Sequence, residues 1–206
     1  MAMKPFMNLI VAMDENNVIG YAKRLPWDTL STDLHWFLTH ATTTKDPSKC
    51  IAVIAGRTTF EEAITFDKKY VSKWHFIVIT KQESDVFYKN HSNVDRRQID
   101  IVQSFNQAAC TAKDLLETQN SMIESVYVFG GVLPYENALN AKLVQRIYLT
   151  RIFAKVSQYD ARLSNFDLSD FQRIKRKIDT FRYSSLDEFQ SYAHRGNQFK
   201  EAVCKL

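Results

Sequence analysis

Glycine is scarce in this sequence, and the chain has no internal repeat and no low-complexity segment. The lack of repeats excludes a repeat architecture, and no linker divides the chain into two domains. A chain this sparing of glycine keeps it where the backbone requires it. We therefore treat the five glycines as markers of special backbone positions: Gly20, Gly56, Gly130, Gly131 and Gly196.

The chain also has few cysteines, a small net charge and no long apolar run. Cys50, Cys110 and Cys204 are odd in number and far apart, which excludes a disulfide framework or a zinc site and favours a reducing compartment. The histidines show no metal spacing, so no metal is expected. A net charge of +4 is too small to indicate nucleic acid. No run is long enough to span a membrane, and the N-terminal apolar run lacks a cleavage site, so we expect a cytoplasmic protein.

The apolar pattern that is present predicts one α/β domain over residues 1–206. Short apolar runs predict strands at 6–13, 50–55, 74–80, 99–103, 126–131 and 146–153. Helices are expected at 31–42, from about 58, at 105–119 and after Pro134. This alternation predicts a mostly parallel central sheet with helices on both faces. The pattern of the last 35 residues predicts an antiparallel hairpin at the edge of this sheet. Residues 84–98 are polar and are expected to form a loop.

Asp33 lies in the first turn of the predicted helix 31–42, for which Ser31 or Thr32 would be the cap. It borders the predicted core stripe of that helix, so we expect it to be half-buried. Two interpretations stay open from position alone. The acid complements the helix dipole, or it is a carboxylate with a raised pKa that binds an amidine-like ligand or relays a proton.

Three predicted strands end in residues suited to an anion. Gly130–Gly131 ends one strand directly before a helix, although a third glycine of a dinucleotide fingerprint is missing. Gly56 ends another and is followed by Arg57, Thr58 and Thr59. Thr80–Lys81 ends a third. Because parallel strands end at one edge of a sheet, these groups together predict a polyanion such as a dinucleotide across that edge.

In this order, several segments resemble those of dihydrofolate reductases. IVAMDENNVIG followed by LPW resembles the first strand and loop of that family, and IAGRTTFEE its strand–Gly–Arg/Lys–x–Thr–Trp segment. VYVFGGVLPYENAL resembles the Gly–Gly–x–x–x–Tyr segment, and YLTRI the strand with an active-site Thr. Asp33, six residues beyond Trp27, falls on the position of the active-site acid of the family.

The resemblance implies NADPH-dependent reduction of 7,8-dihydrofolate to tetrahydrofolate, and we expect a monomer. It implies catalytic roles for Asp33, Trp27, Thr150 and Tyr135. The implied substrate contacts, besides Asp33, are Ile10, Leu34, Phe37, Phe129 and Lys73. The implied cofactor contacts are Ala12, Ile19, Gly20, Gly56, Arg57, Thr58, Thr59, Thr80, Lys81, Gly130, Gly131, Val132 and Leu133.

One departure from the family concerns the tail of folate. The Arg that grips the glutamate carboxylate before the third strand is replaced by Lys73 or Trp74, depending on the alignment, and Lys does not offer the same bidentate fork. Phe129 is also larger than the usual residue beside the pterin. Alternatives are therefore a reductase with weakened tail binding that acts on another pterin, or a non-catalytic NADPH-binding relative. The joint presence of Asp33, Trp27 and Thr150 argues against the second.

Overall fold

A computed structural model describes residues 3–153, 155–180 and 186–194 of the chain. Its strands are β1 Met7–Asp14, β2 Val18–Gly20, β3 Cys50–Gly56, β4 Trp74–Ile79, β5 Ile99–Val102, β6 Ile123–Gly130, β7 Val144–Ile152, β8 Ala161–Arg162, β9 Phe171–Thr180 and β10 Leu186–His194. Its helices are α1 Ser31–Thr42, α2 Arg57–Ala63, α3 Lys68–Val71, α4 Ser84–Asn90, α5 Phe105–Glu117 and α6 Val132–Asn140, with a 3₁₀ turn η1 at Arg96–Gln98.

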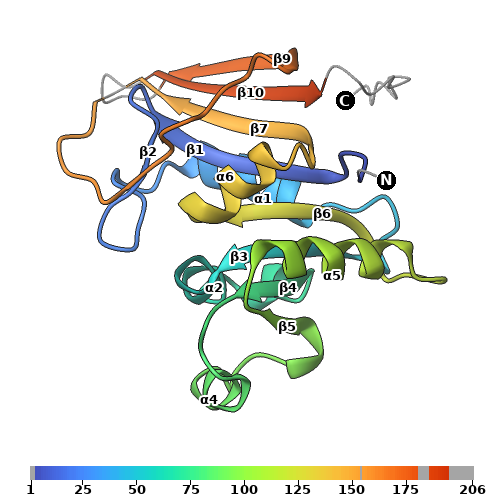
Figure 1. Ribbon diagram of the computed structural model, residues 1–206. Coiled ribbons are helices and arrows are strands. Elements are labelled where there is room, and N and C mark those ends of the chain that lie inside the picture. Colours follow the sequence, from blue (N-terminus) through green and yellow to red (C-terminus); the bar gives the residue numbers. More distant parts are fainter. Residues whose placement is uncertain (1–2, 154, 181–185, 195–206) are drawn as a thin grey trace.

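Eight strands form one sheet in the order β5-β4-β3-β6-β1-β7-β10-β9 (Figure 1). The pairs from β5 to β7 are all parallel, and β10 pairs antiparallel with both β7 and β9. The predicted fold, a mostly parallel sheet with an antiparallel C-terminal edge, is therefore confirmed. Part of the predicted terminal hairpin, at 199–206 with Cys204, lies outside the described residues.

The core has two layers because alternate residues of each central strand point to opposite faces. Met7, Leu9 and Val11 of β1 pack with α5 and α6, whereas Ile10 packs with α1 and α2 on the other face. The core stripe predicted for residues 31–42 is confirmed, and the helix expected at 105–119 also buries one face. Leu38 and Ala41 of α1 are buried in the second layer, and the small residues of α5 are buried in the first: Ala108, Ala109 and Ala112.

Three local predictions are wrong. Residues 84–98 are not a loop, since they contain α4 and η1. Neither Ser31 nor Thr32 caps α1, because the helix begins at Ser31 and its N-cap is Leu30, which makes no side-chain cap bond. α6 begins at Val132, so Pro134 lies inside its first turn, where a missing N–H costs little.

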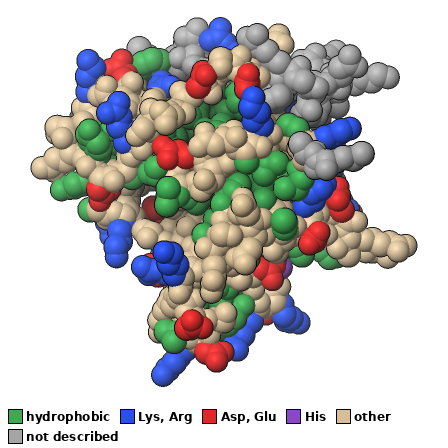
Figure 2. Space-filling model, in the orientation of Figure 1, with side chains coloured by type: hydrophobic (Ala, Val, Ile, Leu, Met, Phe, Trp, Pro, Cys, Tyr) green, Lys and Arg blue, Asp and Glu red, His purple; other side chains and the backbone are tan. Residues whose placement is uncertain are grey.

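Charge on the visible surface is mixed in sign. Figure 2 shows basic and acidic side chains interspersed over one face of the molecule. In the described ranges, no helix is both long enough and apolar enough to cross a membrane. The same residues contain no group of three or more His, Cys, Asp or Glu side chains that could hold a metal ion.

Candidate active site

Two adjoining cavities lie at the carboxyl ends of the central parallel strands, with volumes of about 470 Å³ and 310 Å³. Ligands of open α/β sheets bind at this edge. The cavities have common walls, since both are lined by Ala12 of β1, Thr59 of α2 and Phe129 of β6. A molecule in one cavity would therefore lie next to a molecule in the other.

Asp33 lies in the smaller cavity and is buried. Thr150 of β7 donates a hydrogen bond from Oγ1 to Asp33 Oδ1 over 2.7 Å, and both side chains are buried. Burial raises the pKa of the Asp33 carboxyl, and the bond from Thr150 partly opposes that effect. Asp33 is thus more deeply buried than predicted, and it is held in one orientation by a residue 117 positions along the chain.

The rest of the smaller cavity is largely apolar and aromatic. The predicted substrate residues Ile10, Leu34, Phe37 and Phe129 all line it. The ring of Phe37 packs edge-on against that of Phe129 at a centroid distance of 5.1 Å. This arrangement suits a flat heteroaromatic group whose polar edge reaches Asp33.

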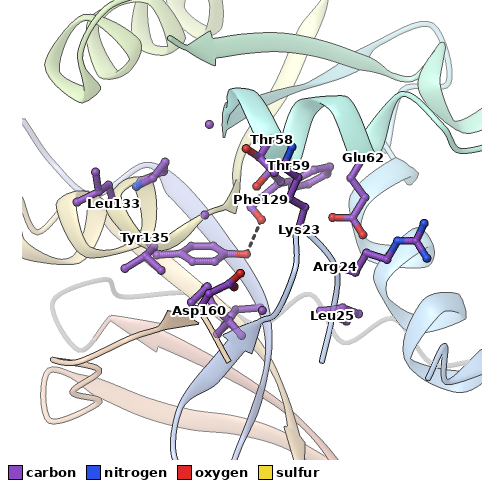
Figure 3. A pocket seen from close by; sticks show the side chains of 18 of the residues that line it. Lys23, Arg24, Leu25, Thr58, Thr59, Glu62, Phe129, Leu133, Tyr135 and Asp160 are labelled. Carbon is purple, nitrogen blue, oxygen red and sulfur yellow. Dashed lines mark hydrogen bonds between the residues drawn. The ribbon is translucent and has the colours of Figure 1, made fainter. Parts of the chain in front are cut away.

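Tyr135 of α6 stands at the boundary between the cavities (Figure 3). Its hydroxyl lies 2.7 Å from the Ile10 carbonyl and 2.6 Å from the Phe129 carbonyl, so its single proton can be donated to either. Burial raises the pKa of the Tyr135 hydroxyl, and the charge of Glu62 raises it further. Tyr135 therefore stays protonated, and its hydroxyl lies between a carbonyl of β1 and a carbonyl of β6.

The larger cavity collects most of the predicted cofactor residues. Its lining includes Ala12, Ile19, Gly20, Gly56, Arg57, Thr58, Thr59, Gly131, Val132 and Leu133. Gly56 and Gly131 lie beside each other, since a Cβ added at Gly56 would make an ordinary contact with the Gly131 nitrogen at 3.7 Å. Arg57 extends from the start of α2, where its Nη1 donates to Glu61 Oε1 at 2.6 Å.

Five of the predicted site residues line neither cavity. Gly130 lies behind the wall, against the ring of Tyr135. The indole Nε1 of Trp27 is buried and has no hydrogen-bond partner in the described structure. Thr80 and Lys81 follow β4 directly, and the pairing of Gly56 with Ile79 puts them just beyond the glycine end of β3. The roles of these four residues stay predictions.

Lys73, the fifth residue, also lies away from the cavities, and its Nζ donates to the Pro47 carbonyl at 3.2 Å. Trp74, the other position aligned with the tail-binding Arg, is fully buried, and its Nε1 donates to the Ala41 carbonyl at 2.5 Å. Trp74 is thus a core residue. The structure brings neither position to the smaller cavity.

Sequence reasoning missed several charged residues of the larger cavity: Lys23, Arg24, Glu62 and Asp160. Lys23 and Arg24 come from the loop after β2, which has no periodic pattern to mark it. Asp160 is distant in sequence and accepts a hydrogen bond from the Ala22 nitrogen at 2.9 Å. Glu62 had a usable signal, because it lies three residues after Thr59 on the same helix face.

Comparisons with known proteins agree with this geometry. The family model described as dihydrofolate reductase matches residues 6–197. A dihydrofolate reductase of Drosophila melanogaster is 30% identical over 149 residues, which cover 72% of this chain and 74% of that protein. A dihydrofolate reductase of Aedes albopictus is 29% identical over 177 residues, which cover 86% of this chain and 88% of that protein.

Larger relatives contain a similar segment. A bifunctional dihydrofolate reductase-thymidylate synthase 1 of Arabidopsis thaliana is 31% identical over 170 residues, which cover 80% of this chain and 30% of that protein. The family match spans nearly the whole chain, and its first and last matched residues enclose every residue of both cavities. This chain belongs to the dihydrofolate reductase family.

Proposed function

We propose that this protein catalyses the NADPH-dependent reduction of 7,8-dihydrofolate to 5,6,7,8-tetrahydrofolate, with the pterin in the smaller cavity and NADPH in the larger. The observation that carries the proposal is the buried Asp33–Thr150 hydrogen bond inside a cavity that shares its walls with a second one. Hydride transfer requires two ligands in contact and one proton source. The adjoining cavities would hold the two ligands in contact, and Asp33 would assist the proton transfer.

The residues of the larger cavity fit a dinucleotide phosphate. Lys23, Arg24 and Arg57 supply positive charge. Gly56 and Gly131 leave backbone exposed at two strand ends, where a Cβ would otherwise stand. When bound, NADPH would supply the hydride, from nicotinamide C4 to pterin C6. Thr80 and Lys81, just beyond the end of β4, are our candidates for the 2′-phosphate contact that would select NADPH over NADH.

Asp33 would bind the polar edge of the pterin. An ionised carboxylate accepts hydrogen bonds from the 2-amino group and the adjacent ring nitrogen, and the raised pKa brings Asp33 closer to the range in which it can also hold a proton. Thr150 would keep Oδ1 oriented. The unpaired indole N–H of Trp27 is suited to hold a water molecule through which N5 gains its proton.

Backbone carbonyls would complete the pterin site. Ile10 and Phe129 line the smaller cavity, and the carbonyl oxygen of each has two lone pairs. One lone pair can accept from Tyr135, and the second can accept from a ligand. An amino group at pterin position 4, as in antifolates, could donate to these oxygens. Tyr135 would hold them in place on the nicotinamide side. We further propose that residues 1–206 act as one domain and as a cytoplasmic monomer, without a nucleic-acid partner.

A steady-state assay with purified protein, NADPH and dihydrofolate tests the proposal. We expect loss of NADPH absorbance with wild-type protein, and a fall in kcat/KM of about 10²-fold or more for Asp33→Asn at neutral pH, which is typical of a lost proton-transfer group. Substrate that is already protonated at acid pH should restore part of that activity. Tight NADPH binding without turnover would instead favour a non-catalytic relative.

A further inference from the structure

Glu62 occupies the wall that the two cavities share. Thr59, Glu62, Ala63 and Phe66 all line the smaller cavity, and their spacing of three or four residues places them along one face of α2 and the turn after it. Glu62 also lines the larger cavity. Figure 3 shows its carboxyl group directed into the space between α2 and the loop that carries Arg24. Glu62 thus faces both ligand positions.

The smaller cavity is acidic. Its two ionisable acids are Asp33 and Glu62, and none of the described residues that line it is a Lys, Arg or His. Its other polar side chains are uncharged: hydroxyls on Thr29, Thr59, Thr150 and Tyr135, and the indole of Trp36. An anionic group that enters this cavity therefore meets two acids and no cationic side chain among the described residues that line it.

Arg24 offsets the charge of Glu62 only in part. Loss of solvent raises the pKa of the Glu62 carboxyl, and the positive charge of Arg24 opposes that effect. Arg24 lines the larger cavity and not the smaller one. An anionic cofactor in the larger cavity would also attract Arg24, so Arg24 would neutralise less of the charge of Glu62. The smaller cavity would then repel a further negative charge more strongly.

We propose that Glu62 is a specificity-determining residue that disfavours substrates with an anionic tail and favours dihydropterins whose side chain is neutral or carries a hydrogen-bond donor. This inference rests on the proposed reductase function. It agrees with the positions of Lys73, outside the cavity, and Trp74, inside the core, where a tail-binding Arg would be expected. The aromatic walls formed by Phe37, Phe66 and Phe129 also suit a short uncharged substituent.

The test compares KM for two substrates at saturating NADPH: dihydrofolate, with its two tail carboxylates, and 6-methyl-7,8-dihydropterin, which has no tail. For Glu62→Gln we expect KM for dihydrofolate to fall about three- to tenfold, the size of one partly screened charge interaction. KM for the methyl pterin should change less than about twofold. Glu62→Lys should lower KM for dihydrofolate further, and this grading with charge distinguishes electrostatics from altered packing.

Glu83→Gln is the matched control, because Glu83 is an exposed acid at the N-cap of α4 that lines neither cavity. It should leave both KM values unchanged. Added salt should lower KM for dihydrofolate in the wild type and have little effect in Glu62→Gln, since salt screens the repulsion. The inference would be overturned if the ratio of KM for dihydrofolate to KM for the methyl pterin were the same in wild type, Glu62→Gln and Glu62→Lys. Failure of every variant to reduce either pterin would overturn the proposed function itself.

Discussion

Two opposing effects set the protonation of Asp33. Burial raises its pKa, and the hydrogen bond from Thr150 lowers it by a smaller amount. Since the native pKa lies above the unfolded value, ionised Asp33 destabilises the native state at neutral pH, and this destabilisation disappears as pH falls through the native pKa. We expect Asp33→Asn to unfold at a higher temperature than wild type at pH 7, with the gap closing towards about pH 4.

Thermal unfolding followed by circular dichroism over this pH range measures the effect. Asp114→Asn, at an exposed position on α5, is the control and should leave the pH profile of the wild type unchanged. A melting temperature for Asp33→Asn that lies below the wild-type value at pH 7 would contradict the prediction. It would mean that the ionised carboxylate is better satisfied than its burial indicates.

Among the glycines that the structure describes, Gly130 alone has a positive φ, of +123°, which disfavours any residue with a side chain. A Cβ there would lie 3.1 Å from Cε2 of Tyr135, whose hydroxyl lies between the Ile10 and Phe129 carbonyls. We expect Gly130→Ala to lower the free energy of unfolding by about 1–3 kcal/mol, measured by urea titration. Gly56→Ala is the matched comparison, because its φ of −69° is ordinary and its Cβ would make only normal contacts.

Gly56→Ala should therefore keep its stability, or gain up to about 1 kcal/mol. It should nevertheless weaken NADPH binding, since its new methyl group would fill the space between two strand ends. Comparable stability losses in the two variants would show that the positive φ of Gly130 is not the deciding feature.

Single residues could be predicted where a local pattern marked them. The stripe of α1 put Asp33 near the core, and glycine scarcity pointed to Gly56 and Gly131. The bond from Thr150 joins residues 117 positions apart, so no local pattern could reveal it, and only the resemblance to a family did. Arg24 and Glu62 were missed because an isolated charge on a loop or a short helix looks the same whether it faces solvent or a cavity.

At the scale of elements, Trp74 connects β4 to the end of α1. Its indole N–H donates to Ala41, one of the last carbonyls of α1, which has no partner within the helix. Its ring packs edge-on against Phe76 and Phe129. We expect Trp74→Phe, which keeps an aromatic ring but loses the bond, to destabilise the protein by about 1–3 kcal/mol in urea unfolding.

Trp74→Arg tests the alignment that places this position at the substrate tail. An Arg at a fully buried position without a partner should destabilise by more than about 3 kcal/mol. Because Trp74 is fully buried and lines neither cavity, we expect an Arg at this position not to lower KM for dihydrofolate. A folded Trp74→Arg variant with a lower KM for dihydrofolate would contradict this prediction.

Elements were predictable in proportion to their apolar content. α5 was placed well because its small and apolar residues recur with helical spacing, and four of them are buried: Phe105, Ala108, Ala109 and Ala112. α4 was missed because Phe87 is its one buried residue in seven, too little for a periodic signal. Its helical form depends on the packing of that ring against Phe60, at a centroid distance of 5.3 Å, which is a long-range contact.

At the scale of the whole molecule, strand alternation predicted the parallel sheet but not its order. β6 is inserted between β3 and β1, more than sixty residues away from either in sequence. Such an order depends on which faces must be covered, and not on any local pattern. Its consequence is functional, because β1 and β6 then supply walls of both cavities, and Gly56 at the end of β3 lines the larger one.

Since both cavities are built on one continuous sheet, we expect the protein to unfold as a single unit. Thermal unfolding should give one transition, identical by circular dichroism and by tryptophan fluorescence, and independent of protein concentration if the monomer is correct. NADPH at about 100 times its Kd should stabilise the fold by about 2.7 kcal/mol, which corresponds to a rise in melting temperature of about 5–10 °C.

NADH at the same concentration should give a smaller rise, because it lacks the 2′-phosphate that we assign to Thr80 and Lys81. Lys81→Gln should reduce the effect of NADPH and leave that of NADH unchanged. Two separate transitions would contradict the single domain, and a melting temperature that rises with protein concentration would contradict the monomer. Equal effects of NADH and NADPH would contradict a favourable contact with the 2′-phosphate. A larger effect of NADPH that persists in Lys81→Gln would place that contact elsewhere, and the cationic residues that line the larger cavity would be the first to test: Lys23, Arg24 and Arg57.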